Sequence, residues 1–211
     1  MYPQKQHFLP ALLLTMVGLL LFFYQGIGQQ NFAGGKTWSL GQSLQVSDFT
    51  LLADSVSGKK ISKGNLAITR TGVAYAIKKT RSNNKQVEIS IVATMHPKNS
   101  FLKESVLQLR EEAIAYLLHH EQGHFDISEI YAREGAKLLR TTRLFKDYRQ
   151  QVYSLMQSLF KQAEAWQTLY DEETRNGQDA NQQRNWNEKI KDRLKSLEAY
   201  QTKKFVRRIK E

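Results

Sequence analysis

Proline and glycine are unevenly distributed in this 211-residue chain, and their distribution divides it into two structural regions. No proline follows Pro97, and the only later glycines are Gly123, Gly135 and Gly177. Because both residue types disfavour helix interiors, the sequence after about Ser105 can form long uninterrupted helices. The region before Pro97 contains instead short segments that are separated by glycines and polar clusters. Strands followed by helices predict an α+β fold rather than a doubly wound sheet.

The region 38–96 has the composition of short strands. Segments 65–79 and 86–96 alternate apolar residues with smaller or polar ones, which is the period of a half-buried strand, and segment 43–52 has a similar β character. The sequence SNNK at residues 82–85 separates two of these segments and predicts a hairpin turn. We therefore expect a small antiparallel sheet.

Helical periodicity dominates after residue 105. The first apolar stripe includes the segment YLLHHEQGHFDISEIYAREGAKLL, and a second runs from about Arg143 to Glu173. A third helix is expected after the break RNGQD, with apolar positions at Trp186, Ile190 and Leu194. We predict that this helix forms a basic C-terminal element over residues 181–211.

The N-terminal segment predicts export from the cytoplasm. Residues 8–24 carry no charge, and small residues at Gly26–Gly28 offer a cleavage site. The apolar core 11–24 is shorter than the ~20 residues of a spanning helix. We predict a signal peptide at 1–28, with a membrane anchor formed by 8–24 as the alternative, and a periplasmic or extracellular location. A linker at 29–37 then precedes a single domain at 38–211.

The charge of the chain is concentrated at its C-terminus. The net charge is +11, and residues 181–211 contain ten Lys or Arg against four Asp or Glu. Such a face can contact an envelope or membrane surface, or can simply be a solvated helix. Nucleic-acid binding has little support, because beyond Trp186 only Tyr200 and Phe205 lie among these basic residues. The absence of cysteine leaves His, Asp and Glu as metal ligands.

The strongest functional signal is His120-Glu121-Gln122-Gly123-His124, which has the pattern H-E-x-x-H. On a helix the two histidines lie about 40° apart and one turn along, so both imidazoles can face one metal ion. Glu121 lies on the adjacent flank, where a general base would act. Gly123 costs ~1 kcal/mol relative to Ala within a helix, which makes sense if something passes close to the backbone there. A match by chance on an ordinary helix is the competing interpretation.

A hydrolytic zinc site usually has a third protein ligand. Carboxylates near the motif on the same helix point elsewhere, and His119 points about 100° away from the pair. Three candidates remain on other elements: His96 at a strand end, Glu164 on the second helix, and Asp171 near the end of that helix. Geometry alone mildly favours Glu164, on the assumption that the second helix folds straight back.

The sequence also resembles a bacterial family catalogued as a domain of unknown function, whose members are predicted to be secreted zinc-dependent proteases. Its core pattern HEQxHFDIxExxAR is similar to the segment around His120, and further similarities are spread over most of the chain after residue 37. These are Trp38, Ser47–Phe49, HPKNSF with Phe101 in place of Trp, YDEETRNG and QQRNW.

The resemblance implies a zincin-like domain with zinc on His120 and His124 and with Glu121 as the general base. Asn176 stands where the family pattern has His, which puts activity in doubt if that His is a ligand. If the Asp of the Tyr-Asp pair is the ligand, Asp171 is intact, and we select Asp171.

The sequence therefore predicts an exported zinc metallopeptidase that acts on a peptide or protein through zinc-activated water. The segment Val87–Ala93 is the strand expected to hold the substrate, by analogy with this class of enzyme. The alternative is a non-catalytic relative, an envelope-associated binding or scaffold protein that docks through its basic C-terminal helix.

Overall fold

The computed structural model describes residues 35–56, 61, 64–81 and 85–211. The predicted signal peptide or anchor at 1–28 and most of the predicted linker lie outside the described residues. The strands are β1 Lys36–Thr37, β2 Thr50–Leu52, β3 Ala67–Ile68, β4 Thr71–Lys79, β5 Gln86–Met95, β6 Phe101–Lys103 and β7 Lys204–Arg208. The helices are α1 Glu111–Thr141, α2 Tyr148–Thr174 and α3 Ala180–Ser196, with 3₁₀ turns at Val46–Asp48, Pro97–Asn99, Glu104–Gln108 and Glu198–Tyr200.

The larger sheet is built around β5. This strand pairs antiparallel with β4 along one edge and with β1 and β7 along the other. The β4–β5 register joins Thr71 to Met95 and Lys79 to Val87, which is the predicted hairpin, although most of its turn lies outside the described residues. The α+β class and the antiparallel sheet are confirmed.

A second, smaller sheet was not predicted. Its order is β2-β6-β3, and β2 runs parallel to β6. The predicted strand 43–52 forms a strand only at Thr50–Leu52, because Val46–Asp48 makes a 3₁₀ turn in which Asp48 accepts from the backbone of Gln45. The last strand of the smaller sheet, β6, is followed by the 3₁₀ turn Glu104–Gln108 and then by α1.

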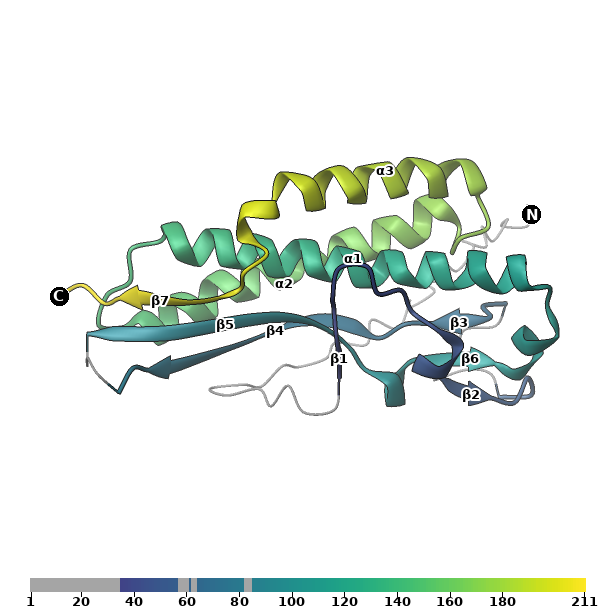
Figure 1. The fold of residues 1–211 in the computed structure, drawn as a ribbon, viewed down its shortest axis with the longest axis horizontal. Coiled ribbons are helices and arrows are strands. Elements are labelled where there is room, and N and C mark those ends of the chain that lie inside the picture. Colours follow the sequence, from purple (N-terminus) through teal and green to yellow (C-terminus); the bar gives the residue numbers. More distant parts are fainter. Residues whose placement is uncertain (1–34, 57–60, 62–63, 82–84) are drawn as a thin grey trace, which may run out of the picture.

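The three helices lie on one side of the larger sheet, as Figure 1 shows, and α1 contacts β4, β5, α2 and α3. Alternate residues of β5 are buried, which include Ile89, Ile91 and Ala93. From the helices, Ile127, Ala136 and other apolar side chains complete the same core. Because α1 has neighbours on several sides, most of its central part is buried, and this includes His120, Glu121 and Gly123 of the H-E-x-x-H motif.

The C-terminal region corrects two boundaries. The prediction of a helix over 181–211 is wrong beyond Ser196, since Lys204–Arg208 forms β7 and pairs with β5. Exposed and half-buried residues alternate along β7, and Phe205 pairs with Ile89, so this charged segment has the period of a strand. The predicted linker also ends earlier than expected, because β1 already pairs with β5. Within the described residues, no helix is long and apolar enough to cross a bilayer.

Candidate metal centre

Two helices bring three potential metal ligands together. His120 and His124 lie one turn apart on α1, and Asp171 lies near the end of α2. Asp171 Oδ1 is 3.3 Å from His120 Nε2 and 3.0 Å from His124 Nε2. One donor atom from each residue lies within 4.8 Å of the other two. The one-turn spacing of the histidines on α1 and the packing of α2 against α1 therefore create a His-His-Asp group that could hold a metal ion.

The group is buried on one side and open on the other. His120 is buried, whereas the Asp171 side chain is 40% exposed. The two imidazole rings are 5.1 Å apart and nearly perpendicular. A metal site whose ligands are buried on one side and accessible on the other can leave a coordination position open for water or a substrate.

Hydrogen bonds at the far side of each imidazole orient the rings. Gln183 Oε1 lies 3.0 Å from His120 Nδ1, and Gln167 Oε1 lies 2.6 Å from His124 Nδ1. With Nδ1 engaged in this way, both Nε2 atoms face Asp171. Bonds of this type from the second ring nitrogen are typical of metal-binding histidines. Neither glutamine was predicted from the sequence, although Gln183 belongs to the QQRNW segment that carried the resemblance.

Two glycines allow close packing around His120. A Cβ at Gly123 would lie 2.3 Å from Tyr170 Oη, and a Cβ at Gly177 would lie 3.0 Å from His120 Cγ. Tyr170 stacks on the His120 ring with centroids 4.7 Å apart and donates a hydrogen bond to His120 O. The expected close approach at Gly123 is therefore made by Tyr170, the residue that precedes the third ligand candidate.

Glu121 is held on the flank of α1 that faces the start of β4. Its side chain is buried, and Thr69 Oγ1 donates to Glu121 Oε2 at 2.5 Å. Thr71 donates to His124 O two residues later. The segment between β3 and β4 thus runs beside the motif and fixes one oxygen of the Glu121 carboxylate. The sequence contained no signal for this contact.

Asp171 and His124 shift each other's pKa. Burial alone would lower the pKa of His124, but its hydrogen bond to Asp171 and the charges of Asp171 and Glu121 raise that pKa to about 9. Burial alone would raise the pKa of Asp171, but hydrogen bonds from His120 and His124 hold it well below its usual range. The metal-free group therefore favours an ionised Asp171 beside a protonated His124.

The other candidate ligands lie elsewhere. Glu164 is exposed on α2 and His96 follows β5 near Thr94, and neither belongs to the His-His-Asp group. The geometric preference for Glu164 is wrong because it assumed that α2 begins near residue 143, whereas α2 begins at Tyr148. Asn176 is exposed in a left-handed turn after α2, where its backbone N–H donates to Asp171 O.

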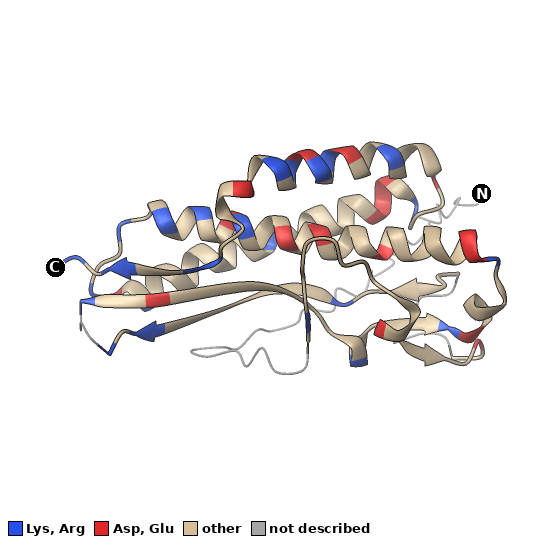
Figure 2. Ribbon diagram, viewed as in Figure 1, with Lys and Arg blue, Asp and Glu red and all other residues tan. Residues whose placement is uncertain are grey.

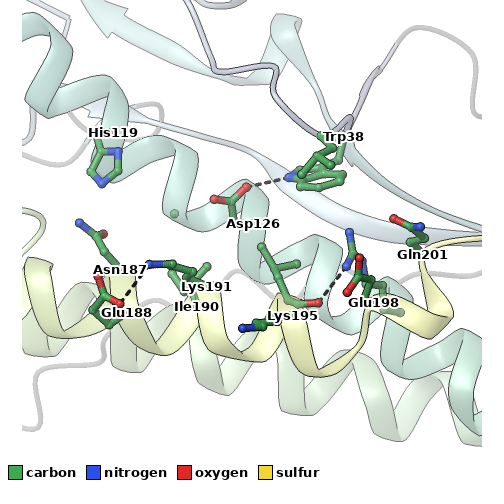
Figure 3. Close-up of a pocket in the computed structure, with 14 residues that line it drawn as sticks. Trp38, His119, Asp126, Asn187, Glu188, Ile190, Lys191, Lys195, Glu198 and Gln201 are labelled. Atoms are coloured by element: carbon green, nitrogen blue, oxygen red, sulfur yellow. Dashed lines mark hydrogen bonds and ion pairs between the residues drawn. The ribbon is translucent and has the colours of Figure 1, made fainter.

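A separate cavity of about 510 Å³ lies on the other flank of α1, between α1 and α3 (Figure 3). Trp38 lies at one side, and its indole N–H donates to Asp126. His119 also lines this cavity, as expected for a residue that points away from the metal-binding pair. None of the three candidate ligands lines it, so the cavity and the metal group are distinct features.

Comparison with known proteins places the chain in one family. The model of a bacterial protein family of unknown function, DUF922, matches residues 47–179. The chain belongs to this family. The DUF922 match covers more than half of the sequence and includes His120, Glu121, His124 and Asp171. Neither the curated proteins nor the solved structures include a match. The family itself assigns no activity, so function has to be argued from the site.

Proposed function

We propose that this chain is an exported zinc-dependent metallopeptidase with a zincin-like site. One observation carries the proposal: the Nε2 atoms of His120 and His124 converge with Asp171 beside a buried glutamate. Two imidazoles and one carboxylate are a ligand set that zinc favours, and three protein ligands leave one coordination position open. Zinc held there would polarise a substrate carbonyl and lower the pKa of a water molecule.

Glu121 is the residue to which we assign the role of general base. It neighbours His120 in sequence, and Thr69 occupies one of its carboxylate oxygens. We assign to Glu121 the removal of a proton from the attacking water and its delivery to the leaving amine. The open flank at Asp171 is where the scissile peptide would enter.

The strand that would hold the substrate differs from the sequence prediction. The segment Val87–Ala93 belongs to β5, which pairs with β4 along one edge and with β1 and β7 along the other, so an added peptide strand would have to displace one of them. Among the described residues, β4 pairs only with β5 and therefore has a free edge. β4 begins two residues after Thr69, the partner of Glu121. An extended peptide added to this edge would run toward the metal group.

Export remains a proposal based on the uncharged segment 8–24. Sequencing of the mature N-terminus from the native bacterial host would test it. Cleavage near residue 28 supports a signal peptide, and an intact N-terminus in the membrane fraction supports an anchor. Recovery of the full-length chain in the cytoplasm would contradict both.

The alternative of a non-catalytic scaffold that docks through a basic helix has less support. Basic and acidic residues are interspersed along α3 (Figure 2). Two basic residues after α3 make internal contacts instead, since Lys203 pairs with the buried Glu129 and Arg207 donates to Thr142 O. These contacts leave less free positive charge at the C-terminus than the sequence suggested.

Metal analysis and peptide hydrolysis test the proposal together. The purified chain should contain about one zinc per molecule, and His120→Ala should lose it. Glu121→Gln should keep the zinc but lose the cleavage of a mixed peptide library. A wild-type chain without metal, or undiminished hydrolysis by Glu121→Gln, would contradict the assignment.

A further inference from the structure

We propose that Gln167 and Gln183 are positioning residues that fix the Nδ1–H form of both imidazoles and thereby present both Nε2 atoms to one metal ion. This inference rests on the proposed metal site. Neither glutamine would touch the metal or the substrate. Each acts through the histidine whose Nδ1 it contacts.

The hydrogen bonds of the Gln167 Nε2 atom determine the orientation of the Gln167 amide. Its Nε2 atom donates to His124 O at 2.8 Å and lies 3.3 Å from Ser128 Oγ. A backbone carbonyl can only accept, so this end of the amide must be the NH₂ group. Gln167 Oε1 is then the atom that lies 2.6 Å from His124 Nδ1. Because Oε1 can only accept, His124 Nδ1 must carry a proton.

The same reasoning applies to Gln183 on α3. Its Nε2 atom donates to Tyr170 Oη at 2.7 Å and to Asn187 Oδ1 at 2.9 Å. Tyr170 has already given its single proton to His120 O, so its oxygen is free to accept. Gln183 Oε1 therefore faces His120 Nδ1 as an acceptor at 3.0 Å. This network is buried, and each of these polar atoms has its partner within the protein.

The two glutamines come from different helices, and both are neutral. Gln167 lies on α2 and Gln183 on α3, so the two ring orientations depend on both helices that pack against α1. A neutral acceptor orients a ring without adding charge, so with both imidazoles neutral, as metal binding requires, Asp171 would be the only charged member of the set formed by the three ligands and two glutamines. Loss of an acceptor of this kind typically weakens metal binding by 10–100-fold.

Gln167→Met tests the inference, because it keeps the length of the side chain and removes its hydrogen bonds. Gln162→Met is the matched control, since Gln162 is exposed on the same helix and its amide donates to Ser158 O, away from the histidines. Gln167→Glu keeps an acceptor oxygen near His124. Zinc affinity is measured by chelator competition, and the Nδ1–H protons are observed by NMR on protein with ¹⁵N-labelled histidine, with and without zinc.

Gln167→Met should bind zinc about 10–100-fold more weakly and lose the protected Nδ1–H signal of His124. Gln167→Glu should retain that signal and recover part of the affinity, and Gln162→Met should match wild type. Unchanged affinity and an unchanged signal in Gln167→Met would overturn the inference. Because Gln183 is more deeply buried, Gln183→Met is a second variant only if it folds.

The design separates this inference from the proposed function. If the wild-type chain binds no zinc, the metallopeptidase proposal fails, while protection of the Nδ1–H protons from solvent exchange still reports on the glutamines in the metal-free protein. Signals that depend on Gln167 would then support its positioning role. Their absence from the wild-type protein would overturn it, whatever the metal content.

Discussion

At the scale of single residues, the site depends on the absence of a side chain at Gly123. Gly123 lies in the interior of α1, where alanine would favour the helix by ~1 kcal/mol. The structure gives the reason for glycine, because Tyr170 Oη occupies the space that a Cβ would need. That hydroxyl links His120 O to Gln183. The absence of a methyl group at Gly123 therefore allows Tyr170 to pack against His120 and to hold this hydrogen-bond network together.

Gly123→Ala should therefore destabilise the protein in spite of the better helix propensity. We expect a loss of about 1–3 kcal/mol in the free energy of unfolding, because Tyr170 must move away from His120. Urea denaturation measures this change. Gly72→Ala is the control, since nothing lies within 4 Å of a Cβ at that position. A more stable Gly123→Ala protein would show that the contact with Tyr170 is not essential.

Zinc affinity should rise with pH and then level off. In the metal-free protein the pKa of His124 is raised to about 9, so below that pH zinc must displace a proton. The lowered pKa of Asp171 keeps this carboxylate ionised throughout the neutral range. The apparent affinity should increase about tenfold per pH unit between pH 7 and 9 and change little above it. Calorimetry in buffers of different ionisation enthalpy should detect about one released proton near pH 7.5. A flat profile would contradict this linkage.

At the scale of elements, β7 and the residue before it show that the charged C-terminal segment packs into the fold. Glu129 is fully buried on α1 and pairs with Arg133 of the same helix and with Lys203, which directly precedes β7. A buried carboxylate of this kind needs its cations, because the loss of one partner leaves charge without compensation. The tail therefore connects α1 to the edge of β5.

Deletion of residues 197–211 should lower the free energy of unfolding by about 3 kcal/mol or more. It removes the buried Leu197 side chain, the Lys203 partner of Glu129 and the strand that covers part of β5. Thermal and urea denaturation measure the effect. The double substitution Lys191→Ser and Lys195→Ser, on the exposed surface of α3, should change stability by less than about 0.5 kcal/mol. Equal stability of the truncated chain would restore the view of the tail as a solvated appendage.

At the scale of the whole molecule, the metal group lies at the contact between the helices of the helical layer. The three ligands join α1 to α2, and Gln183 adds α3 through its bond to His120. A metal ion bound there would add its binding free energy to the packing of all three helices, because the unfolded chain does not hold these atoms together.

Zinc removal should accordingly lower the melting temperature of the whole domain. At a free zinc concentration 100 times the Kd, binding stabilises the folded state by about 2.7 kcal/mol. A chelator should abolish this increment, and Asp171→Asn should reduce it at equal zinc concentration. Calorimetry of the wild type and this variant, with and without chelator, makes the comparison. A melting temperature that zinc does not change would argue against binding at this site.

The sequence by itself determined the features that follow from the spacing of residues along a single strand or helix. The order of strands and helices up to Ser196, the β4–β5 hairpin and the pair His120–His124 all depend on residues close together in the chain. Glu121 was identified in the same way, since its flank is set by helix geometry alone.

Only the tertiary structure decided which distant side chains meet that pair. The resemblance pointed to Asp171, but the residues alone left Glu164 and His96 open. The contact of Asp171 with both histidines depends on where α2 begins and on how it crosses α1, neither of which local propensity specifies. Gln167, Gln183 and Thr69 came from three separate segments and had no pattern of their own. The conversion of the basic tail into β7 was decided by the open edge of β5 and the buried charge of Glu129, which exist only after the chain has folded.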